Sequence, residues 1–421
     1  MSAQSFVSAS FHIAPTLRAK VGHDPVSYFL AFARLAAAQV AWWGHADTTG
    51  ISSIDYFVSS DVEVPAADAH YSERLVRLKG LGAFFLKPAF ALGPVAASTP
   101  PRLNHTAHGT AAPSNQSAAQ HGGDEGSEEV DPSSAEAFQG RRSRVRQEVA
   151  AMLSLPKQFH FYLCPQALVK FHPTFDEVLL SLLEKDKLAY VLLLDGADRR
   201  AWTEALMDRL AGRMLLDRAG AGSHAIPVSS SSSSGGGRGV HADTKFAQEV
   251  SAARASVERR LLFVGGDNER GVTMAALYES ADVVLDLFPT SGYVTSLQAL
   301  CVGAPVVTLP STLLGGRLTL ALYQQMGFKQ RVAAPHRGFA AAAGRESEAL
   351  DVMGLLVAES PADFVTKALS VAFSPLVRRE ALRVAILGAL PHLWEDRRAV
   401  EQWDVLLSRL ADEHYAPRSP T

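Results

Sequence analysis

One lysine follows an apolar run that has the length of a β-strand. The run at 159–164 is followed by Gln166 and then by Lys170. Ligands of doubly wound sheets bind beyond the carboxyl ends of the strands, where a lysine can bind a diphosphate as a point charge. A surface lysine at a helix start is the alternative interpretation. We therefore treat Lys170 as a candidate phosphate ligand.

A loop rich in hydroxyl groups lies between another apolar run and a helix-like stretch. It spans 288–298 and contains Gly292, Thr295 and Ser296. The free N–H groups and the dipole at a helix start favour an anion there. Serine and threonine are also common N-caps, so a capped helix without a ligand stays open as an alternative. Together with Lys170, the loop predicts a site for a nucleoside diphosphate.

Two titratable residues lie on a short turn nearer the N-terminus. The stretch 44–50 contains His45 and Asp47 between two strand-like runs. Aspartate is also an ordinary turn-forming residue. We take His45 and Asp47 as candidate cleft residues, and the pattern identifies no catalytic base.

The elements that would position these residues alternate between apolar strands and amphipathic helices. Strand-like runs occur at 159–164, 189–194, 261–264, 283–287 and 306–309, and helix-like spacing occurs at 175–183 and 294–302. Continuous apolar strands interleaved with helices are typical of a parallel sheet covered on both faces. We expect a doubly wound α/β domain over 141–374, with Gly303 as a left-handed helix terminus.

The rest of the chain predicts three further regions. Residues 1–97 indicate a shorter α/β unit, with a helix at 26–38 and strands at 39–43 and 55–59. Residues 98–140 and 219–243 are rich in small and polar residues, so we expect two disordered insertions. Residues 375–421 indicate two helices that break near Pro391.

Composition argues against several classes of protein. Lys and Arg total 40 and Asp and Glu total 43, a formal charge of −3, which disfavours a nucleic-acid partner. No apolar run approaches the roughly 20 residues that span a bilayer, and the start does not resemble a signal peptide, so we expect no membrane partner. The two cysteines, Cys164 and Cys301, cannot form a disulfide framework. We expect a reducing compartment, the cytoplasm or the nucleus.

Several collinear motifs resemble the O-GlcNAc transferase family. In the expected doubly wound domain they are YLCPQALVKFHP at 162–173, GAPVVTLP at 303–310, and the stretches 281–286, 292–300 and 316–317. In the first half they are QVAWWGHADTTG at 39–50 and the stretches 54–57 and 70–78. The resemblance covers most of the chain outside the two expected insertions.

This resemblance implies a fold, a reaction and a set of site residues. The fold is glycosyltransferase B, with two nucleotide-type α/β domains across a cleft and the last helices packed back over it. The reaction is inverting transfer of N-acetylglucosamine from UDP-N-acetylglucosamine to Ser or Thr of intracellular proteins, with no metal and no cofactor. Lys170 matches the family's phosphate-binding lysine and is our catalytic candidate. The donor-binding positions fall on Gln166, Gly292, Tyr293, Thr295, Ser296 and Gln298.

The chain departs from the family's pattern in three places. Gln298 stands where the family usually has a carboxylate, and Tyr293 and Val294 stand where His or Thr is common. About 38 residues precede Gln39, so we expect one complete doubly wound domain and a truncated N-terminal α/β unit. Two functions follow: an active protein O-linked N-acetylglucosaminyltransferase, or a catalytically inactive nucleotide-sugar-binding or scaffolding member. A donor with another base, such as a GDP-sugar, stays open.

Overall fold

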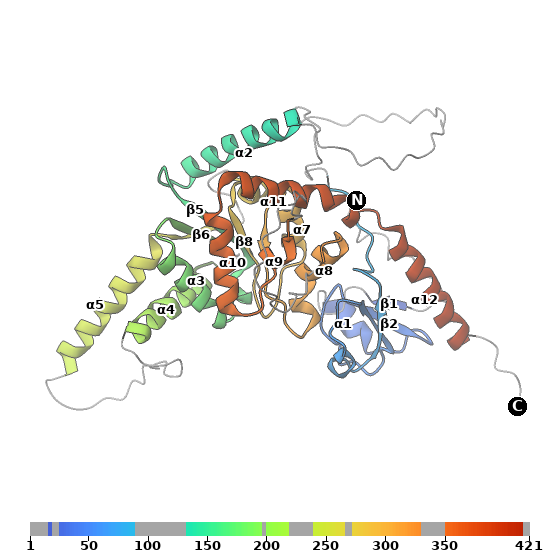
Figure 1. Ribbon diagram of the computed structural model, residues 1–421. Coiled ribbons are helices and arrows are strands. Elements are labelled where there is room, and N and C mark those ends of the chain that lie inside the picture. Colours follow the sequence, from blue (N-terminus) through green and yellow to red (C-terminus); the bar gives the residue numbers. More distant parts are fainter. Residues whose placement is uncertain are drawn as a thin grey trace, which may run out of the picture.

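The larger of the two parallel sheets in the described residues is built from strands between residues 160 and 307 (Figure 1). The computed structural model describes residues 16–18, 25–88, 132–195, 199–218, 239–265, 272–329 and 350–415. The five strands are β5 (His160–Ala167), β6 (Ala189–Asp195), β7 (Leu261–Gly265), β8 (Val283–Leu285) and β9 (Val306–Val307). Their order is β7-β6-β5-β8-β9, and every pair is parallel.

The order of this sheet reverses between β5 and β8. The chain adds β6 and β7 on one side of β5, and then adds β8 and β9 on the other side. Such a switch point leaves a crevice at the carboxyl ends of the two central strands, where ligands of open α/β sheets bind. Successive residues of β5 and β8 are buried, so both faces of the sheet are covered.

Helices of this domain provide that cover. They are α2 (Pro132–Met152), α3 (Thr174–Lys185), α4 (Arg199–Arg218), α5 (Gly239–Glu258), α6 (Met274–Ser280), α7 (Val294–Cys301), α8 (Leu318–Gln325), α9 (Val352–Leu356), α10 (Pro361–Phe373) and α11 (Leu376–Ala389). On α3 the predicted helical spacing is confirmed, because Phe175, Val178, Leu179, Leu182 and Leu183 are all buried. Just after α7, Gly303 has a φ of 71°, which is the left-handed conformation that its position predicts.

The N-terminal unit is a smaller parallel sheet of four strands. It consists of β1 (Thr16–Arg18), β2 (Gln39–Trp42), β3 (Tyr56–Ser60) and β4 (Arg74–Leu78), in that order, with α1 (Pro25–Ala31) after β1. The last helix, α12 (Arg397–Tyr415), follows the short helix η5 (Leu390–Leu393) and crosses to this unit (Figure 1). Leu406 and Leu410 of α12 pack with Val40 and Val58 of the sheet.

Several boundaries differ from the sequence expectations. The helix expected at 26–38 ends at Ala31, and α2 and α5 begin inside the expected insertions, at Pro132 and Gly239. The small residues that open α2 resemble a linker, but the Glu, Gln, Arg and Ala that follow are strong helix formers, and proline suits a first helical position. Residues 98–131 and 219–238 lie outside the described residues. Among the helices that the structure describes, none combines the length and apolarity needed to cross a bilayer.

Candidate functional site

The candidate phosphate ligand lies at the carboxyl end of β5. Gln166 is the second-to-last residue of that strand, and Lys170 ends the short 3₁₀ helix η3 (Leu168–Lys170) that follows it. The Lys170 Nζ lies 3.5 Å from the Gln166 Oε1. Gln166 is only 4% exposed, whereas Lys170 is exposed. The amide is therefore fixed by packing while the ammonium group is open to a ligand.

The first turn of α7 places the Thr295 hydroxyl group next to Gln166. The Gln166 Nε2 donates a hydrogen bond of 2.5 Å to the Thr295 Oγ1. A Cβ atom at Gly292 would collide with both of these side-chain atoms, so the contact requires glycine there. No side chain of the described residues caps the first N–H groups of α7. An uncapped helix start beside an ammonium group can bind an anion.

Asp286 holds this loop from the protein interior. It follows β8, accepts a 2.6 Å hydrogen bond from the Gly292 N–H, and accepts a 2.8 Å bond from the Thr308 hydroxyl. Complete burial raises the pKa of Asp286 to about 6, although these hydrogen bonds and the charge of Lys170 act in the opposite direction. Asp286 was not among the site residues predicted from the sequence. A lone acidic residue directly after an apolar strand and before a glycine loop is the signal that could have identified it.

Two other predicted loop residues do not join the Lys170 cluster. Ser296 is buried, donates a 3.3 Å bond to the Gly292 carbonyl, and accepts a 2.8 Å bond from the Thr319 hydroxyl of α8. The Gln298 Oε1 accepts a 3.4 Å bond from the Tyr278 hydroxyl of α6. Ser296 therefore supports the shape of the loop, and Gln298 is turned toward a neighbouring helix.

Tyr293 points toward the N-terminal unit. Its ring centroid is 5.0 Å from that of Trp43, in an edge-on arrangement, and 5.7 Å from that of Phe85. Burial raises the pKa of the Tyr293 hydroxyl well above its usual range, and the hydroxyl has no hydrogen-bond partner within the described ranges. Tyr293 thus forms an aromatic contact between the two units.

The turn that carries His45 and Asp47 lies next to this loop. A Cβ atom added at Gly315 would lie 3.6 Å from the Cβ of Ala46, and the Gly315 carbonyl accepts a 2.8 Å bond from the Ser291 N–H, one residue before Gly292. Glu73 fixes the turn by accepting bonds of 2.7 and 2.8 Å from the Thr48 hydroxyl and the Thr49 N–H.

The pKa of Glu73 reflects the hydrogen bonds that this residue accepts from the turn. Burial alone would raise the pKa of Glu73, but the hydrogen bonds from Thr49 and Thr48 outweigh it and lower the pKa. The carboxylate is therefore stabilised in its charged form, and the turn is fixed at the edge of the N-terminal unit.

Arg317, which follows the Gly315 loop, joins the two units directly. Its Nε donates a 2.7 Å bond to the carbonyl of Val62, which lies in the turn after β3, and its Nη1 donates a 2.9 Å bond to the Ser311 carbonyl. Burial lowers the pKa of Arg317, and the nearby Glu63 partly offsets this. This role of Arg317 could not be predicted from the sequence, since its partners are backbone carbonyls that no motif reveals.

Comparisons with known proteins support the architecture. No protein-family model and no curated protein matches the chain. Among solved structures, a mutant of the O-GlcNAc transferase from Thermobaculum terrenum is similar over 94% of this chain and 52% of its own, with 19% identity and a TM-score of 0.55. This likeness confirms the glycosyltransferase B fold. The chain spans about half the length of that structure.

Two further structures are less similar. A glycosyltransferase from Rickettsia africae covers 68% of this chain and 56% of its own, with 10% identity and a TM-score of 0.34. A UDP-forming trehalose-phosphate synthase from Burkholderia xenovorans covers 66% and 51%, with 10% identity and a TM-score of 0.34.

Proposed function

We propose that this protein is a glycosyltransferase that binds a nucleoside-diphosphate sugar at the carboxyl ends of β5 and β8. One observation carries the proposal: Lys170, Gln166, Thr295 and the uncapped start of α7 converge at the switch point of a glycosyltransferase B fold. An exposed ammonium group, a fixed amide and free helix N–H groups are the donors that a diphosphate requires.

Within this class we propose inverting transfer of N-acetylglucosamine from UDP-N-acetylglucosamine to Ser or Thr of protein acceptors, in the cytoplasm or nucleus. Two observations support it. The motifs at 39–50, 162–173 and 303–310 resemble the O-GlcNAc transferase family. The solved structure with the same fold over 94% of this chain is described as an O-GlcNAc transferase.

The proposed chemistry depends on charge that develops on the leaving group. As the bond between the sugar carbon and the phosphate oxygen breaks, the diphosphate gains negative charge, and the acceptor hydroxyl attacks from the opposite face. Lys170 and the N–H groups of α7 would stabilise that charge without a metal or a cofactor. The Asp286 carboxylate keeps the loop in position through Gly292.

Calorimetric titration with UDP tests the donor site. We expect Lys170→Ala to weaken UDP binding at least tenfold, about 1.4 kcal/mol, with no change in Tm because the side chain is exposed. Lys187→Ala, which removes an exposed lysine at the other end of the same sheet, is the matched control and should bind UDP normally. Unchanged affinity in Lys170→Ala would contradict the proposal.

A second candidate function is a catalytically inactive nucleotide-sugar-binding or scaffolding protein. The contact between Gln298 and Tyr278 favours it, because the family's ribose-binding carboxylate is replaced by an amide that is turned toward α6. An assay of donor hydrolysis with UDP-N-acetylglucosamine and with GDP-sugars separates the two functions. Binding without turnover would select the inactive protein.

A further inference from the structure

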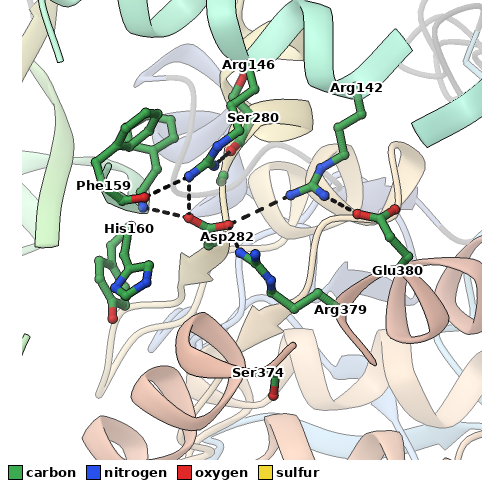
Figure 2. Close-up of polar contacts among 12 residues, drawn as sticks. Arg142, Arg146, Phe159, His160, Ser280, Asp282, Ser374, Arg379 and Glu380 are labelled. Carbon is green, nitrogen blue, oxygen red and sulfur yellow. Dashed lines mark hydrogen bonds and ion pairs between the residues drawn. The ribbon is translucent and has the colours of Figure 1, made fainter. Parts of the chain in front are cut away.

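Three arginines converge on one buried carboxylate at the amino end of the larger sheet (Figure 2). Asp282 directly precedes β8 and is 2% exposed. Arg146 of α2 donates a 2.8 Å bond to its Oδ2, Arg142 of α2 lies 3.9 Å from its Oδ1, and Arg379 of α11 donates to Oδ1. One negative charge therefore faces three positive charges.

The nearby carboxylate and the backbone do not restore the balance. The Asp282 Oδ2 also accepts a 2.9 Å bond from the Phe161 N–H, so its lone pairs are already used. Glu380 pairs with Arg142. A fourth arginine, Arg383, is buried beside the group, and burial together with the charge of Arg142 lowers the pKa of Arg383 to about 9. The cluster has an excess of positive charge.

Some donors of the cluster are also unused. The Nε of Arg379 and the Nη1 of Arg383 are buried and lack a hydrogen-bond partner in the part of the chain that the structure describes. A buried polar group without a partner costs free energy comparable to a lost hydrogen bond. These two groups add to the local excess of hydrogen-bond donors over acceptors.

A cavity of about 340 Å³ opens beside Arg379 and Arg146. It is lined by Arg146, Lys157, Gln158, Phe159, His160, Leu188 and Arg379. Three of these described lining residues carry a permanent positive charge and none is acidic. Lys157 is exposed and makes no ion pair with any described residue. Arg146 and Arg379 share the single carboxylate of Asp282 with Arg142, so the surface of the cavity keeps an excess of positive charge.

Besides the three cations, the lining contains the polar side chains of Gln158 and His160, and a buried carboxylate contacts His160 from outside the lining. The His160 Nδ1 lies 2.7 Å from the Oδ2 of Asp186, which also accepts a 2.9 Å bond from the Tyr162 hydroxyl. Asp186 is 1% exposed and lies outside the lining. This contact fixes the orientation of the imidazole ring through its Nδ1. The other ring nitrogen, Nε2, takes no part in the contact.

We propose that this cavity binds a small phosphate-bearing anion at the amino end of the sheet. Lys157, Arg379 and His160 are the groups that would contact it. Arg146 adds charge, since its Nη atoms already donate to Asp282, Ser280 and Phe159. β5 has eight residues, so its two ends are roughly 23 Å apart and this cavity is separate from the Lys170 site.

Titration with pyrophosphate at constant ionic strength tests the proposal on the full chain. Lys170→Ala serves as the background, because it weakens the other phosphate site. We expect this variant to bind pyrophosphate and to gain Tm with pyrophosphate concentration. Adding Lys157→Gln should weaken the binding at least tenfold, whereas adding Lys187→Gln should leave it unchanged. Lys157 touches neither Asp282 nor the core, so the variant should fold normally.

Two results would overturn the proposal. One is that the Lys170→Ala variant binds no pyrophosphate at millimolar concentrations. The other is that Lys157→Gln leaves its affinity unchanged. Inorganic phosphate in a parallel titration should compete with pyrophosphate, because a single phosphate group is the shared feature. Failure of phosphate to compete would also contradict a phosphate site.

Discussion

The two ends of the larger sheet use a buried aspartate in opposite ways. At the carboxyl end, Asp286 binds a backbone N–H and a hydroxyl, and the Lys170 ammonium remains exposed. At the amino end, Asp282 faces Arg142, Arg146 and Arg379, and its charge joins α2 to α11. An aspartate at a strand end therefore shapes a loop when its partners are neutral, and joins helices when they are charged.

The largest expected effect is at the amino end. Asp282→Ala should lower the free energy of unfolding by about 3–5 kcal/mol, because it leaves buried guanidinium groups without a counter-charge. Urea denaturation monitored by circular dichroism measures it. Asp68→Ala, which breaks a solvent-exposed pair with Arg77, is the control and should change stability little. Equal losses of unfolding free energy in the two variants would show that the buried ion pairs of Asp282 stabilise the fold no more than an exposed pair does.

The next effect is a pH dependence at the carboxyl end. The pKa of Asp286 is about 6 in the folded protein, above its ordinary value of 3.8. Between about pH 4 and 6 the folded state therefore keeps a proton that the unfolded chain has released, so the contribution of Asp286 to stability falls as the pH rises through this range. The fall should reach roughly 3 kcal/mol and should end above pH 6.

Asp286→Asn removes this titration. The difference in the free energy of unfolding between the variant and the natural protein should shift in favour of the variant as the pH rises from 4 to 6. Urea denaturation at several pH values follows that difference. A difference that is independent of pH would mean that Asp286 stays ionised in the folded protein and that burial does not dominate its environment.

A smaller effect is expected from filling the space at Gly292. Gly292→Ala places a methyl group against Gln166 and Thr295, so it should cost about 1–3 kcal/mol of stability and should weaken UDP binding. Gly212→Ala is the matched control, since a Cβ there meets no atom and α4 should gain up to about 1 kcal/mol. Thermal unfolding and calorimetry of both variants check this. A stable Gly292→Ala variant with normal UDP affinity would show that the Gly292 loop does not form part of the donor site.

The carboxyl end of the sheet is predictable from the sequence because its signals are local. The apolar runs of β5, β6 and β7 and the spacing of α3 each lie within a few residues, and strand ends meet at one edge by a general rule. Those two facts bring Lys170 and Thr295 together, although 125 positions separate them in the sequence. The prediction of a doubly wound domain rested on the same signals, whereas the glycosyltransferase B fold was implied by the motif resemblance.

The amino end gave no such signal. Asp282 is one polar residue before an apolar run, and its partner Arg146 lies far away in the sequence, on a helix that resembles a linker at its start. The direction of Tyr293 was equally hidden, because Trp43 and Phe85 of the other unit determine where its ring packs. Contacts that depend on the packing of distant elements leave no periodic pattern in the sequence.

The smallest expected effect concerns Gln298, which tests how complete the carboxyl end is as a ligand site. Its Oε1 accepts a 3.4 Å bond from the Tyr278 hydroxyl, so Gln298→Ala should cost at most about 1 kcal/mol of stability. UDP affinity should change less than about twofold, roughly 0.4 kcal/mol, because the side chain is turned toward α6. A tenfold loss in calorimetry would instead place Gln298 on the nucleotide. Gln298→Glu then becomes informative, since a carboxylate on a ribose hydroxyl would strengthen UDP binding, whereas one held against Tyr278 would not.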